Sequence, residues 1–460
     1  MIGKIFKAYD VRATYPEPLN EEAGWLVGYG TGEYLKKNNG GQTGTVLVSR
    51  DMRPHSPGLC KALSDGIRAT GMDVVDLGMC DTSFMYFAVP HLNAVGGVQT
   101  TASHNPINYN GFKVSKDGAK PVGGETGLKD IQAIAEGFTG EKPEPTGGFK
   151  EMDLWAEYRK YIQRFLSPLT KPIKAYIDGS NGMAGKLVPQ AFFDVENLEI
   201  SDIYFEMGNG FVHEPNPLVA ENMIPTQDGV KKIGAQLGAC FDGDADRCMV
   251  VDEKGGIIGC DHLTAMLAEH YFAKDNPGTT IVYDLRSSKV VEETIARLGL
   301  KGRKGKVGHV NMKAALRETE GAFGGELSGH FYFRDNNYAD SGAITFACVL
   351  SVLEANPDKT LSELVDPYRK YPQSGEINFE VEDKVGVMNL LKEKYGSKAT
   401  VEELDGVSID AFDGEGWWFN VRASNTEPLL RLNAEAKDQA TLDGLLKELE
   451  PHLGTPAEGH

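Results

Sequence analysis

Three times along this chain, an apolar run that contains small residues ends in a short polar loop. The runs lie near Ala94 to Val98, Ala239 to Phe241 and Ala322 to Gly325, and their composition indicates buried strands. Strand and helix patterns alternate around them, which predicts largely parallel sheets flanked by helices. We therefore expect an α/β fold built from a divergent repeat. Its polar loops should lie at the carboxyl ends of strands, where open α/β sheets carry their chemistry.

The chain is longer than one hydrophobic core usually supports. It has 460 residues, so three or four domains are expected. Residues 137–149 are rich in Gly, Pro and Glu, as linkers are, and residues 367–374 mark another boundary. After that boundary short strand and helix patterns alternate, which indicates a smaller α+β domain. The expected domains are residues 1–150, 151–258, 259–367 and 368–460.

The net charge of −19 limits the partners that this chain can have. So acidic a surface repels nucleic acid and anionic membranes, and we expect neither as a partner. The longest apolar candidate, Ala343 to Leu353, contains Ser351 and suits a buried helix rather than a membrane span. The N-terminal residues lack the features of a signal peptide, and the six cysteines include no C-x-x-C pair. Both observations favour a cytoplasmic protein.

An anionic substrate would also be repelled by this charge, so its site would need local cations. The candidate cations are Lys7, Arg12, Lys113, Arg247, Arg422 and Arg431. For Lys7 and Arg431, an ordinary surface position is an equally good interpretation.

The first polar loop offers a candidate nucleophile. Ser103 and His104 lie between the expected strand and Pro106, which stops any regular element and favours an extended Asn105. Ser103 is therefore expected on a stiff loop, where a serine beside a histidine suits nucleophilic chemistry. The alternative is a turn formed by Ser and Asn with a solvated histidine. For this motif taken alone, the turn is the stronger interpretation.

The second polar loop carries aspartates at alternate positions, namely Asp242, Asp244 and Asp246. In an extended segment these side chains project to one side, and carboxylates about 4 Å apart repel by roughly 4 kcal/mol at an effective dielectric of 20. A convergent trio therefore requires a cation, and oxygen ligands select Mg²⁺ or Ca²⁺. An EF-hand is rejected because Arg247 occupies the position that needs glycine and a strand pattern follows. A solvated acidic turn is the remaining alternative.

Four motifs in a fixed order carry a resemblance to a known family. They are T-A-S-H-N-P at 101–106, D-G-D-A-D-R at 242–247, G-E-L-S-G-H at 325–330 and R-A-S-N-T-E-P at 422–428, and F-K-A-Y-D-V-R precedes them at 6–12. Over essentially its whole length the chain resembles the α-D-phosphohexomutase superfamily, and most of all its bacterial phosphomannomutase/phosphoglucomutase branch. The resemblance implies three similar mixed-sheet α/β domains and a smaller C-terminal α+β domain around a central cleft.

The resemblance also implies roles for individual residues. Ser103 matches the serine that carries a phosphoryl group, and a phosphoserine oxygen is implied as a metal ligand beside Asp242, Asp244 and Asp246. The residues implied to read the sugar are Glu326, Ser328, Gly329 and His330. Those implied to hold the non-reacting phosphate are Arg422, Ser424, Asn425 and Thr426. Those implied to contact substrate or assist proton transfer are Tyr9, Arg12, Lys113, Arg247 and His309.

Two positions depart from the family pattern. Leu327 replaces an expected Met, a volume-conserving change that should be tolerated. Arg286 stands where a substrate-contacting Lys is usual, so it joins the candidate substrate-binding residues. Because Arg and Lys differ in donor geometry, its role there is left open.

The implied activity is the interconversion of hexose 1-phosphate and hexose 6-phosphate, with mannose, glucose or both as the sugar. A phosphoserine enzyme, Mg²⁺, and glucose 1,6-bisphosphate or mannose 1,6-bisphosphate as activator and intermediate are implied with it. The proton acceptor stays open among His104, Lys113 and His309. A monomer or weak homodimer is expected.

Three alternatives compete with this activity. Phosphoglucosamine mutase is the nearest, although that enzyme usually has Gln where Leu327 stands and Gly where Ala245 stands. A metal-dependent sugar-phosphate phosphatase and a non-enzymatic phosphosugar-binding protein belong to other functional classes. Neither of the last two explains why Ser103, the acidic trio and the phosphate anchor occur together.

Overall fold

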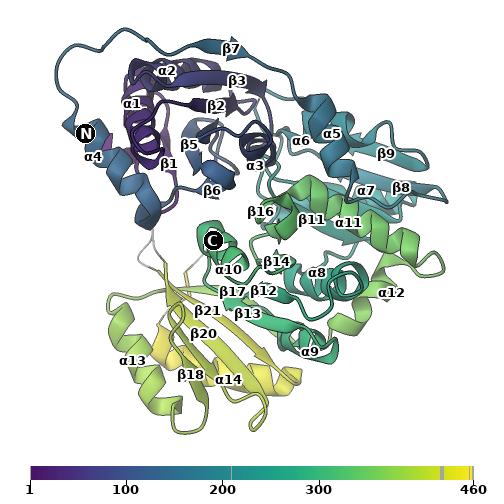
Figure 1. Cartoon of the computed structure of the whole chain (residues 1–460). Helices are drawn as coiled ribbons and strands as arrows, with labels where there is room; N and C mark the ends of the chain where they lie inside the picture. The colour runs from purple at the N-terminus through teal and green to yellow at the C-terminus, as the bar shows by residue number, and fades with distance from the viewer. Residues whose placement is uncertain (1, 209, 425–428, 455, 458–460) are drawn as a thin grey trace.

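The computed structural model describes residues 2–208, 210–424, 429–454 and 456–457. These residues form four β-sheets with helices packed against them, and each sheet defines a unit of the molecule (Figure 1). Unit I contains β1 to β7, unit II β8 to β11, unit III β12 to β16 and unit IV β17 to β21.

Unit I has a mixed sheet in the order β1-β5-β4-β2-β3-β7, with β6 paired to β5. Its strands are β1 Val11–Thr14, β2 Thr45–Arg50, β3 Asp73–Met79, β4 Gly96–Thr100, β5 Tyr109–Lys116, β6 Lys120–Pro121 and β7 Phe149–Glu151. Its helices are α1 Glu21–Asn38, α2 Ser56–Ala69, α3 Thr82–His91 and α4 Lys129–Gly137.

Unit II has the strand order β11-β10-β8-β9, and unit III has the order β13-β12-β14-β15-β16. The elements of unit II are α5 Trp155–Gln163, β8 Ile173–Asp178, α6 Ala184–Phe192, β9 Leu198–Ile203, α7 Ala220–Ile233, β10 Leu237–Phe241 and β11 Cys248–Asp252. Those of unit III are α8 Cys260–Leu267, β12 Thr280–Asp284, α9 Lys289–Arg297, β13 Lys301–Gly305, α10 His309–Glu318, β14 Phe323–Gly325, β15 Phe331–Phe333, β16 Ala339–Asp340, α11 Gly342–Ala355 and α12 Leu361–Val365.

Unit IV is smaller, and its sheet is antiparallel throughout, in the order β17-β21-β20-β19-β18. Its elements are β17 Gln373–Glu380, α13 Lys384–Tyr395, β18 Thr400–Glu402, β19 Val407–Asp410, β20 Trp417–Ala423, β21 Leu429–Ala436 and α14 Gln439–Leu453.

Units I, II and III share one strand pattern. In each, a central strand (β2, β8 or β12) pairs in parallel with a strand on either side. A further strand (β5, β11 or β15) then runs antiparallel beside β4, β10 or β14. The loops that lead into these antiparallel strands are the three polar loops of the sequence. The expected repeat and the mixed-sheet α/β fold are therefore confirmed.

Local sequence signals explain where the first two helices begin. The Asn20 side chain accepts a hydrogen bond from the Ala23 N–H and caps α1, whose first turn is acidic and whose last turn is basic. The second helix has Pro57 in its first turn, where a missing N–H costs nothing. The segment from Asp261 to Ala273 is not one continuous α-helix, because α8 is followed by a π-helical turn over Ala268–Phe272.

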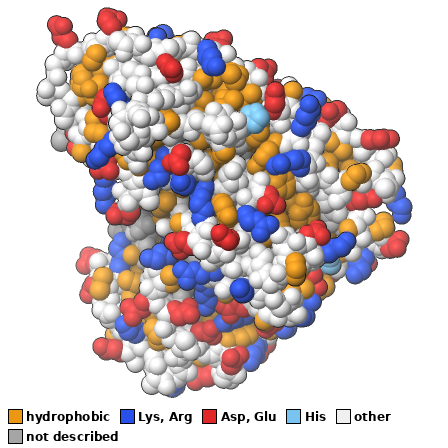
Figure 2. Space-filling model, in the orientation of Figure 1, with side chains coloured by type: hydrophobic (Ala, Val, Ile, Leu, Met, Phe, Trp, Pro, Cys, Tyr) orange, Lys and Arg blue, Asp and Glu red, His pale blue; other side chains and the backbone are white. Residues whose placement is uncertain are grey.

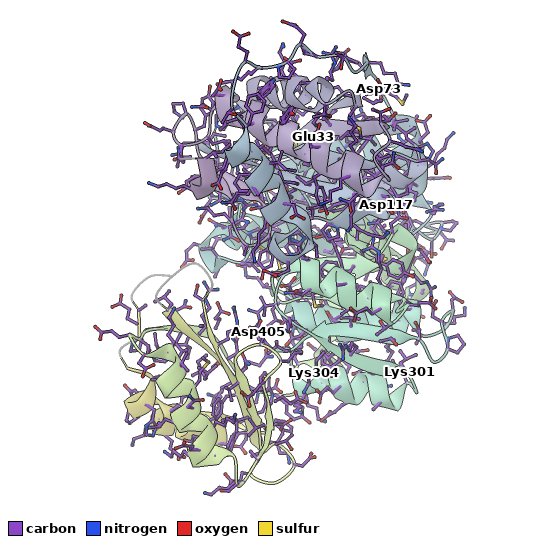
Figure 3. All side chains as sticks on the ribbon, turned by 60° about the vertical axis from the view of Figure 1, so that its left-hand side comes forward. Glu33, Asp73, Asp117, Lys301, Lys304 and Asp405 are labelled. Carbon is purple, nitrogen blue, oxygen red and sulfur yellow. The ribbon has the colours of Figure 1, made fainter. Side chains whose placement is uncertain are left out.

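The apolar cores show how firmly the units are joined. Units II and III and one face of unit I share a continuous core, which includes most of α11. Unit IV has a separate core that extends from Phe379 to Leu453. Polar contacts join it to unit III: Lys304 Nζ donates to Glu402 Oε2 at 2.9 Å, and the Val307 N–H donates to Asp405 Oδ2 at 3.3 Å (Figure 3).

The outline of the molecule is hollowed between units I and IV, and Lys and Arg side chains gather on the surface beside this hollow (Figure 2). Among the described residues, no helix combines the length and the apolar character that crossing a bilayer requires.

Candidate active site

The loop between β4 and β5 holds Ser103 in an uncommon backbone conformation. Ser103 has a φ of +50° and is only 2% exposed. Its N–H donates to Thr101 Oγ1 at 3.0 Å, and the Asn105 N–H donates to the Ala102 carbonyl at 3.0 Å. Such a conformation costs about 1–3 kcal/mol in a residue other than glycine and persists only where its surroundings fix it. The structure therefore places the serine on a constrained loop at the carboxyl end of a buried strand.

The loop between β10 and β11 gathers the aspartates, but it is not an extended segment. Residues 242–247 form a turn in which Ala245 has a φ of +60°, so the expectation of an extended trio is wrong. Alternate residues of a strand lie about 6.6 Å apart, which is too far for three carboxylates to share one ion. In the turn, one oxygen each of Asp242, Asp244 and Asp246 lies within 4.8 Å of the others.

The two loops touch each other across the boundary between units I and II. Ser103 Oγ donates to Asp242 Oδ2 at 3.0 Å. The Thr82 N–H, at the start of α3, donates to the Asp244 carbonyl at 3.1 Å. A Cβ atom on Gly243 would lie 2.3 Å from the Ser103 carbonyl oxygen, so the close approach of the two loops requires glycine there. Ser103 and the acidic trio therefore form one site.

Cations balance part of the negative charge of the trio. Lys113 Nζ, from β5, lies 2.7 Å from Asp244 Oδ2 and 2.7 Å from Asp246 Oδ2. Arg247 Nε lies 3.6 Å from Asp242 Oδ2. Within the described part of the chain, the buried Asp244 Oδ1 has no hydrogen-bond partner. An acidic cluster with an unused buried oxygen fits a metal site.

The carboxylates of the trio differ in acidity. Burial, together with the charges of Asp246 and Asp244, raises the pKa of Asp242 well above its ordinary value. Burial alone would also raise the pKa of Asp246, but Lys113, the hydrogen bond from His330, and Arg247 hold it well below that value. The pKa values of Asp242 and Asp246 are therefore shifted in opposite directions.

A neighbouring group consists of Asp246, His330 and Asp340, whose ligand atoms also lie within 4.8 Å of one another. Lys313 Nζ lies 2.8 Å from Asp340 Oδ1, and both side chains are buried. The Lys313 ammonium supplies the positive charge that this carboxylate needs. This group is less suited to Mg²⁺ than the trio because one of its three donors is a histidine nitrogen.

The candidate proton acceptors differ in charge. His104 Nδ1 lies 3.3 Å from Ser103 Oγ, and burial with nearby Arg247 lowers the pKa of His104 well below its ordinary value. Burial and the Lys313 ammonium lower the pKa of His309 in the same way. Both imidazoles are therefore neutral at pH 7 and able to accept a proton. Burial lowers the pKa of Lys113, but the charges of Asp244 and Asp246 raise it above the ordinary value.

The predicted sugar-reading loop connects β14 to β15 and faces the trio. Glu326 is 2% exposed; its Oε1 accepts from the Gly308 N–H at 2.8 Å and its Oε2 accepts from the Tyr332 hydroxyl at 2.7 Å. Ser328 Oγ and His330 Nδ1 lie 2.8 Å apart. His330 Nε2 reaches to 3.3 Å from Asp246 Oδ1, which connects this loop to the acidic trio. Gly329, between Ser328 and His330, has a φ of +86°.

The N-terminal segment contacts both the Ser103 loop and unit III. Arg12 Nη1 donates to Asn105 Oδ1 at 2.7 Å. The Tyr9 hydroxyl donates to the Val307 carbonyl at 3.4 Å, and the Tyr9 ring meets the His309 ring edge-on at 5.9 Å between centroids. The structure thus brings Tyr9, Arg12 and His309 toward the same region as Ser103.

A second group of cations lies where unit III meets unit IV. Arg286 donates from Nε to Asp284 Oδ1 at 2.9 Å and from Nη1 to Glu376 Oε2 at 2.9 Å. Arg422 Nη2 donates to the same Glu376 oxygen at 3.0 Å, and Arg431 Nη1 donates to Glu376 Oε1 at 3.1 Å. Glu376 therefore bonds to both Arg422, a predicted phosphate-binding residue, and Arg286, which stands where the family usually has Lys. Asp284 holds Arg286 from the other side.

Sequence reasoning did not single out Asp284 or Glu376. A charged residue at the end of a strand signals Asp284, but Glu376 lies among alternating polar residues that resemble an exposed strand face. Ser424 follows β20 and is 8% exposed. The predicted phosphate-binding residues Asn425 and Thr426 lie outside the described residues.

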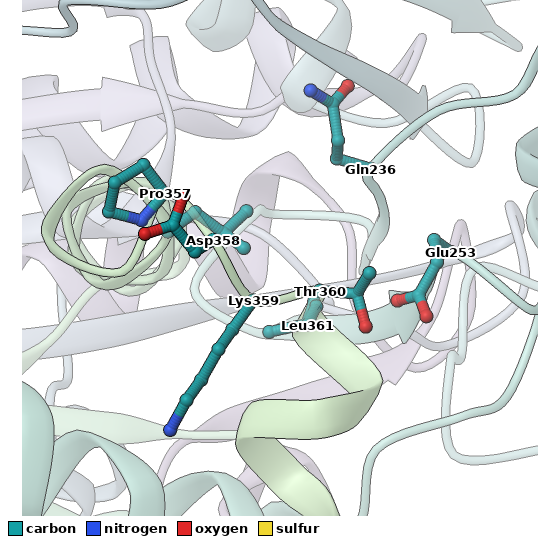
Figure 4. A pocket seen from close by; sticks show the side chains of 8 residues that line it. Gln236, Glu253, Pro357, Asp358, Lys359, Thr360 and Leu361 are labelled. Carbon is teal, nitrogen blue, oxygen red and sulfur yellow. The ribbon is translucent and has the colours of Figure 1, made fainter.

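A surface pocket of about 260 Å³ lies away from these groups, and none of its lining residues is a predicted site residue (Figure 4). It is lined by Gln236, Glu253, Leu353, Pro357, Asp358, Lys359, Thr360 and Leu361. The Glu253 carboxylate accepts from the Ser362 N–H at 3.0 Å, as a structural bridge between units II and III.

Known proteins match this chain along almost its whole length. Models of phosphoglucomutase/phosphomannomutase alpha/beta/alpha domains I, II and III match residues 3–142, 156–256 and 260–371, and a model of the C-terminal domain matches residues 376–452. A phosphomannomutase of Vibrio cholerae serotype O1 is 37% identical over 445 residues, which cover 95% of each chain.

Further relatives agree. A phosphomannomutase of Escherichia coli K12 is 37% identical over 447 residues, which cover 95% of this chain and 96% of the relative. The crystal structure of a phosphoglucomutase/phosphomannomutase family protein from Burkholderia thailandensis has a TM-score of 0.87 and 29% identity, and covers 98% of both chains. The chain therefore belongs to the phosphoglucomutase/phosphomannomutase family of the α-D-phosphohexomutase superfamily, and it is a phosphohexose mutase.

Proposed function

We propose that this mutase moves the phosphoryl group of mannose or glucose phosphates between positions 1 and 6 by way of Ser103. The observation that carries the proposal is the 3.0 Å contact between Ser103 Oγ and Asp242 Oδ2. It brings a hydroxyl from unit I against an acidic cluster from unit II. A phosphoserine adds a charge of about −1.5 to −2, which would be strongly repelled there without a counter-ion.

Mg²⁺ is the proposed counter-ion, held by Asp242, Asp244, Asp246 and an oxygen of phosphorylated Ser103. The oxygen-only donor set and the buried, unused Asp244 Oδ1 support this choice. When bound, the ion would offset the phosphoserine charge and polarise the phosphoryl group.

The proposed reaction has two phosphoryl transfers in opposite directions. In the first, the bond between phosphorus and Ser103 Oγ breaks, and phosphorus bonds to the free hydroxyl oxygen of a hexose monophosphate. The hydroxyl proton passes to a base, for which neutral His104 and His309 are the candidates that the pKa shifts favour over Lys113. The product is glucose 1,6-bisphosphate or mannose 1,6-bisphosphate. After it turns over, the other phosphoryl group returns to Ser103 Oγ and the proton returns to the sugar oxygen.

This scheme needs one anchor for whichever phosphate is not reacting. Arg422 is the proposed anchor, with Ser424, Asn425 and Thr426, because a guanidinium binds phosphate through two parallel hydrogen bonds. Glu326, Ser328, Gly329 and His330 are the proposed sugar-reading residues, beside Tyr9, Arg12, Arg247 and Arg286. Contacts away from C2 would accept both mannose and glucose.

Substitution of Ser103 tests the proposal. Wild-type protein, Ser103→Ala and the control Ser115→Ala, which changes another buried serine of unit I, are assayed with glucose 1-phosphate and mannose 1-phosphate. The assay contains catalytic bisphosphate and Mg²⁺. We expect Ser103→Ala to lose turnover by a factor on the order of 10³ or more, because it removes the group that carries the phosphoryl. Full turnover by Ser103→Ala would refute the proposal.

The same assay separates the alternatives. A phosphatase would release inorganic phosphate from glucose 1-phosphate without forming glucose 6-phosphate. A phosphoglucosamine mutase would prefer glucosamine 6-phosphate to both hexose phosphates. Leu327 and Ala245 stand where that enzyme usually has Gln and Gly, so we expect the hexose phosphates to be preferred.

A further inference from the structure

Arg53 lies behind the Ser103 loop and is 1% exposed. Its guanidinium donates to main-chain carbonyls of this loop and of the strand that follows. Nη2 donates to the Ser103 carbonyl at 3.0 Å and to the Asn105 carbonyl at 2.7 Å. Nη1 donates to the Pro106 carbonyl at 2.6 Å and to the Tyr109 carbonyl at 3.1 Å. One side chain therefore bonds to the loop at Ser103 and Asn105 and again further along at Pro106 and Tyr109.

Asp51 holds Arg53 in turn. Arg53 Nε donates to Asp51 Oδ2 at 3.1 Å, so each of the guanidinium's five N–H groups has an acceptor. Thr101 Oγ1 donates to the same Asp51 oxygen at 2.7 Å and accepts from the Ser103 N–H at 3.0 Å. Asp51 is also 1% exposed. The carboxylate neutralises the guanidinium charge, and Thr101 continues the network to the Ser103 backbone.

These hydrogen bonds supply donors to the carbonyl groups of the loop. The Pro106 carbonyl also accepts from the Tyr109 N–H at 3.0 Å, and a buried carbonyl without a donor costs about 1–3 kcal/mol. Lysine has three donors on a single nitrogen, whereas arginine spreads five donors over a rigid planar fork. Phe211 of unit II covers the guanidinium, with its ring centroid 5.4 Å from the central carbon. Arg53 is therefore enclosed and held in one orientation.

We propose that Arg53 is the positioning residue of the phosphoryl-carrying serine. By fixing the carbonyls on both sides of the bend, it holds Ser103 at a φ of +50° with Oγ directed toward Asp242. Among the described residues Arg53 has no hydrogen bond to Oγ, and its charge is paired with Asp51, so its effect on Ser103 is through the geometry of the loop. The inference rests on the proposed role of Ser103.

Arg53→Lys tests this inference, because it keeps the charge and removes the fork. We expect kcat to fall by about 10²-fold, since a displacement near 1 Å at a reacting atom has about that effect. KM for glucose 1-phosphate should stay within about twofold, because the proposed phosphate anchor lies on unit IV. Guanidinium ion added to Arg53→Ala should restore part of the lost turnover.

The matched control is Arg317→Lys. Arg317 Nη2 also donates to main-chain carbonyls, those of Gly118 at 2.9 Å and Asn337 at 2.7 Å, but it lies away from the Ser103 loop. We expect this control to keep its kcat even if its melting temperature falls. Wild-type kcat in folded Arg53→Lys, or an equal loss of kcat in the control, would overturn the inference.

Thr101→Val decides the matter if Arg53→Lys does not fold. It removes the hydroxyl that connects Asp51 to the Ser103 N–H, and we expect kcat to fall about tenfold with KM unchanged. Wild-type kcat in this variant would then overturn the inference. Ser103→Ala distinguishes a failure of the positioning role from a failure of the proposed function. If it is inactive while Arg53→Lys is fully active, only the positioning role fails; if it is active, the proposed function fails as well.

Discussion

At the scale of single residues, Asp81 couples pH to the boundary between units I and II. It caps α3 by accepting from the Phe84 N–H at 3.1 Å, and it accepts from the Tyr158 hydroxyl of unit II at 2.9 Å. Burial raises the pKa of Asp81 to about 7, and the charge of Asp244 contributes in the same direction. Folding therefore favours the protonated form of this carboxyl group.

The sign of the pH effect follows from this shift. Because the pKa of Asp81 is about 3.9 in an unfolded chain, the folded protein binds more protons between about pH 4 and pH 7. Asp81 therefore contributes most to stability below about pH 4. As the pH rises from about 4 through about 7, the free energy of unfolding falls by up to about 4 kcal/mol. We expect Asp81→Asn to lose this dependence while keeping an acceptor for both hydrogen bonds.

Urea unfolding of wild type and Asp81→Asn at about pH 5 and about pH 8 measures the difference. Exposed Asp443→Asn on α14 is the control for the same substitution outside this boundary. A gap between wild type and Asp81→Asn that is the same at both pH values would contradict the account.

At the scale of elements, the turn that carries the acidic trio has to pack against the Ser103 loop, and Gly243 is where they meet. A Cβ there would lie 2.3 Å from the Ser103 carbonyl oxygen and 3.6 Å from Pro215 Cβ. We expect Gly243→Ala to push the loops apart, with a stability loss of about 1–3 kcal/mol and a fall in kcat of at least about tenfold. Thermal melting and the coupled assay measure these effects.

Gly444→Ala in α14 is the matched control, because a Cβ there meets nothing within 4 Å. It should leave kcat unchanged and raise stability by about 0.5–1 kcal/mol through helix propensity. Wild-type turnover by Gly243→Ala would show that the close approach of the two loops is not needed.

Elements with a repeating pattern or a clear start signal could be predicted from the sequence. Pro57, in the first turn of α2, is such a start signal for the helix from Ser56 to Ala69. The residues of the acidic trio could also be predicted, but their turn could not, since it depends on the left-handed Ala245 and on packing against another unit. Arg53 could not be predicted because its partners are main-chain carbonyls, which have no signature in the sequence.

At the scale of the whole molecule, units I, II and III carry the proposed reacting groups around a core that unit I shares on one face, and unit IV, with its own core, carries the proposed anchor. The Ser103 loop, the acidic turn and the proposed sugar-reading loop follow equivalent strands of units I, II and III. Unit IV meets unit III through charged contacts, among them the partly exposed pair of Lys304 with Glu402 at 2.9 Å. Ion pairs near a surface exchange more readily than a packed core, so this joint is the part of the molecule best suited to move.

The central claim is that Ser103 carries the phosphoryl group between the two ends of the sugar. Peptide mass spectrometry of the protein after incubation with glucose 1,6-bisphosphate tests it most directly. We predict one phosphoryl group on the peptide that contains Ser103, and its loss when glucose 6-phosphate is then added. A protein that interconverts the hexose phosphates while Ser103 stays unmodified, or with the phosphoryl group on another residue, would contradict the account.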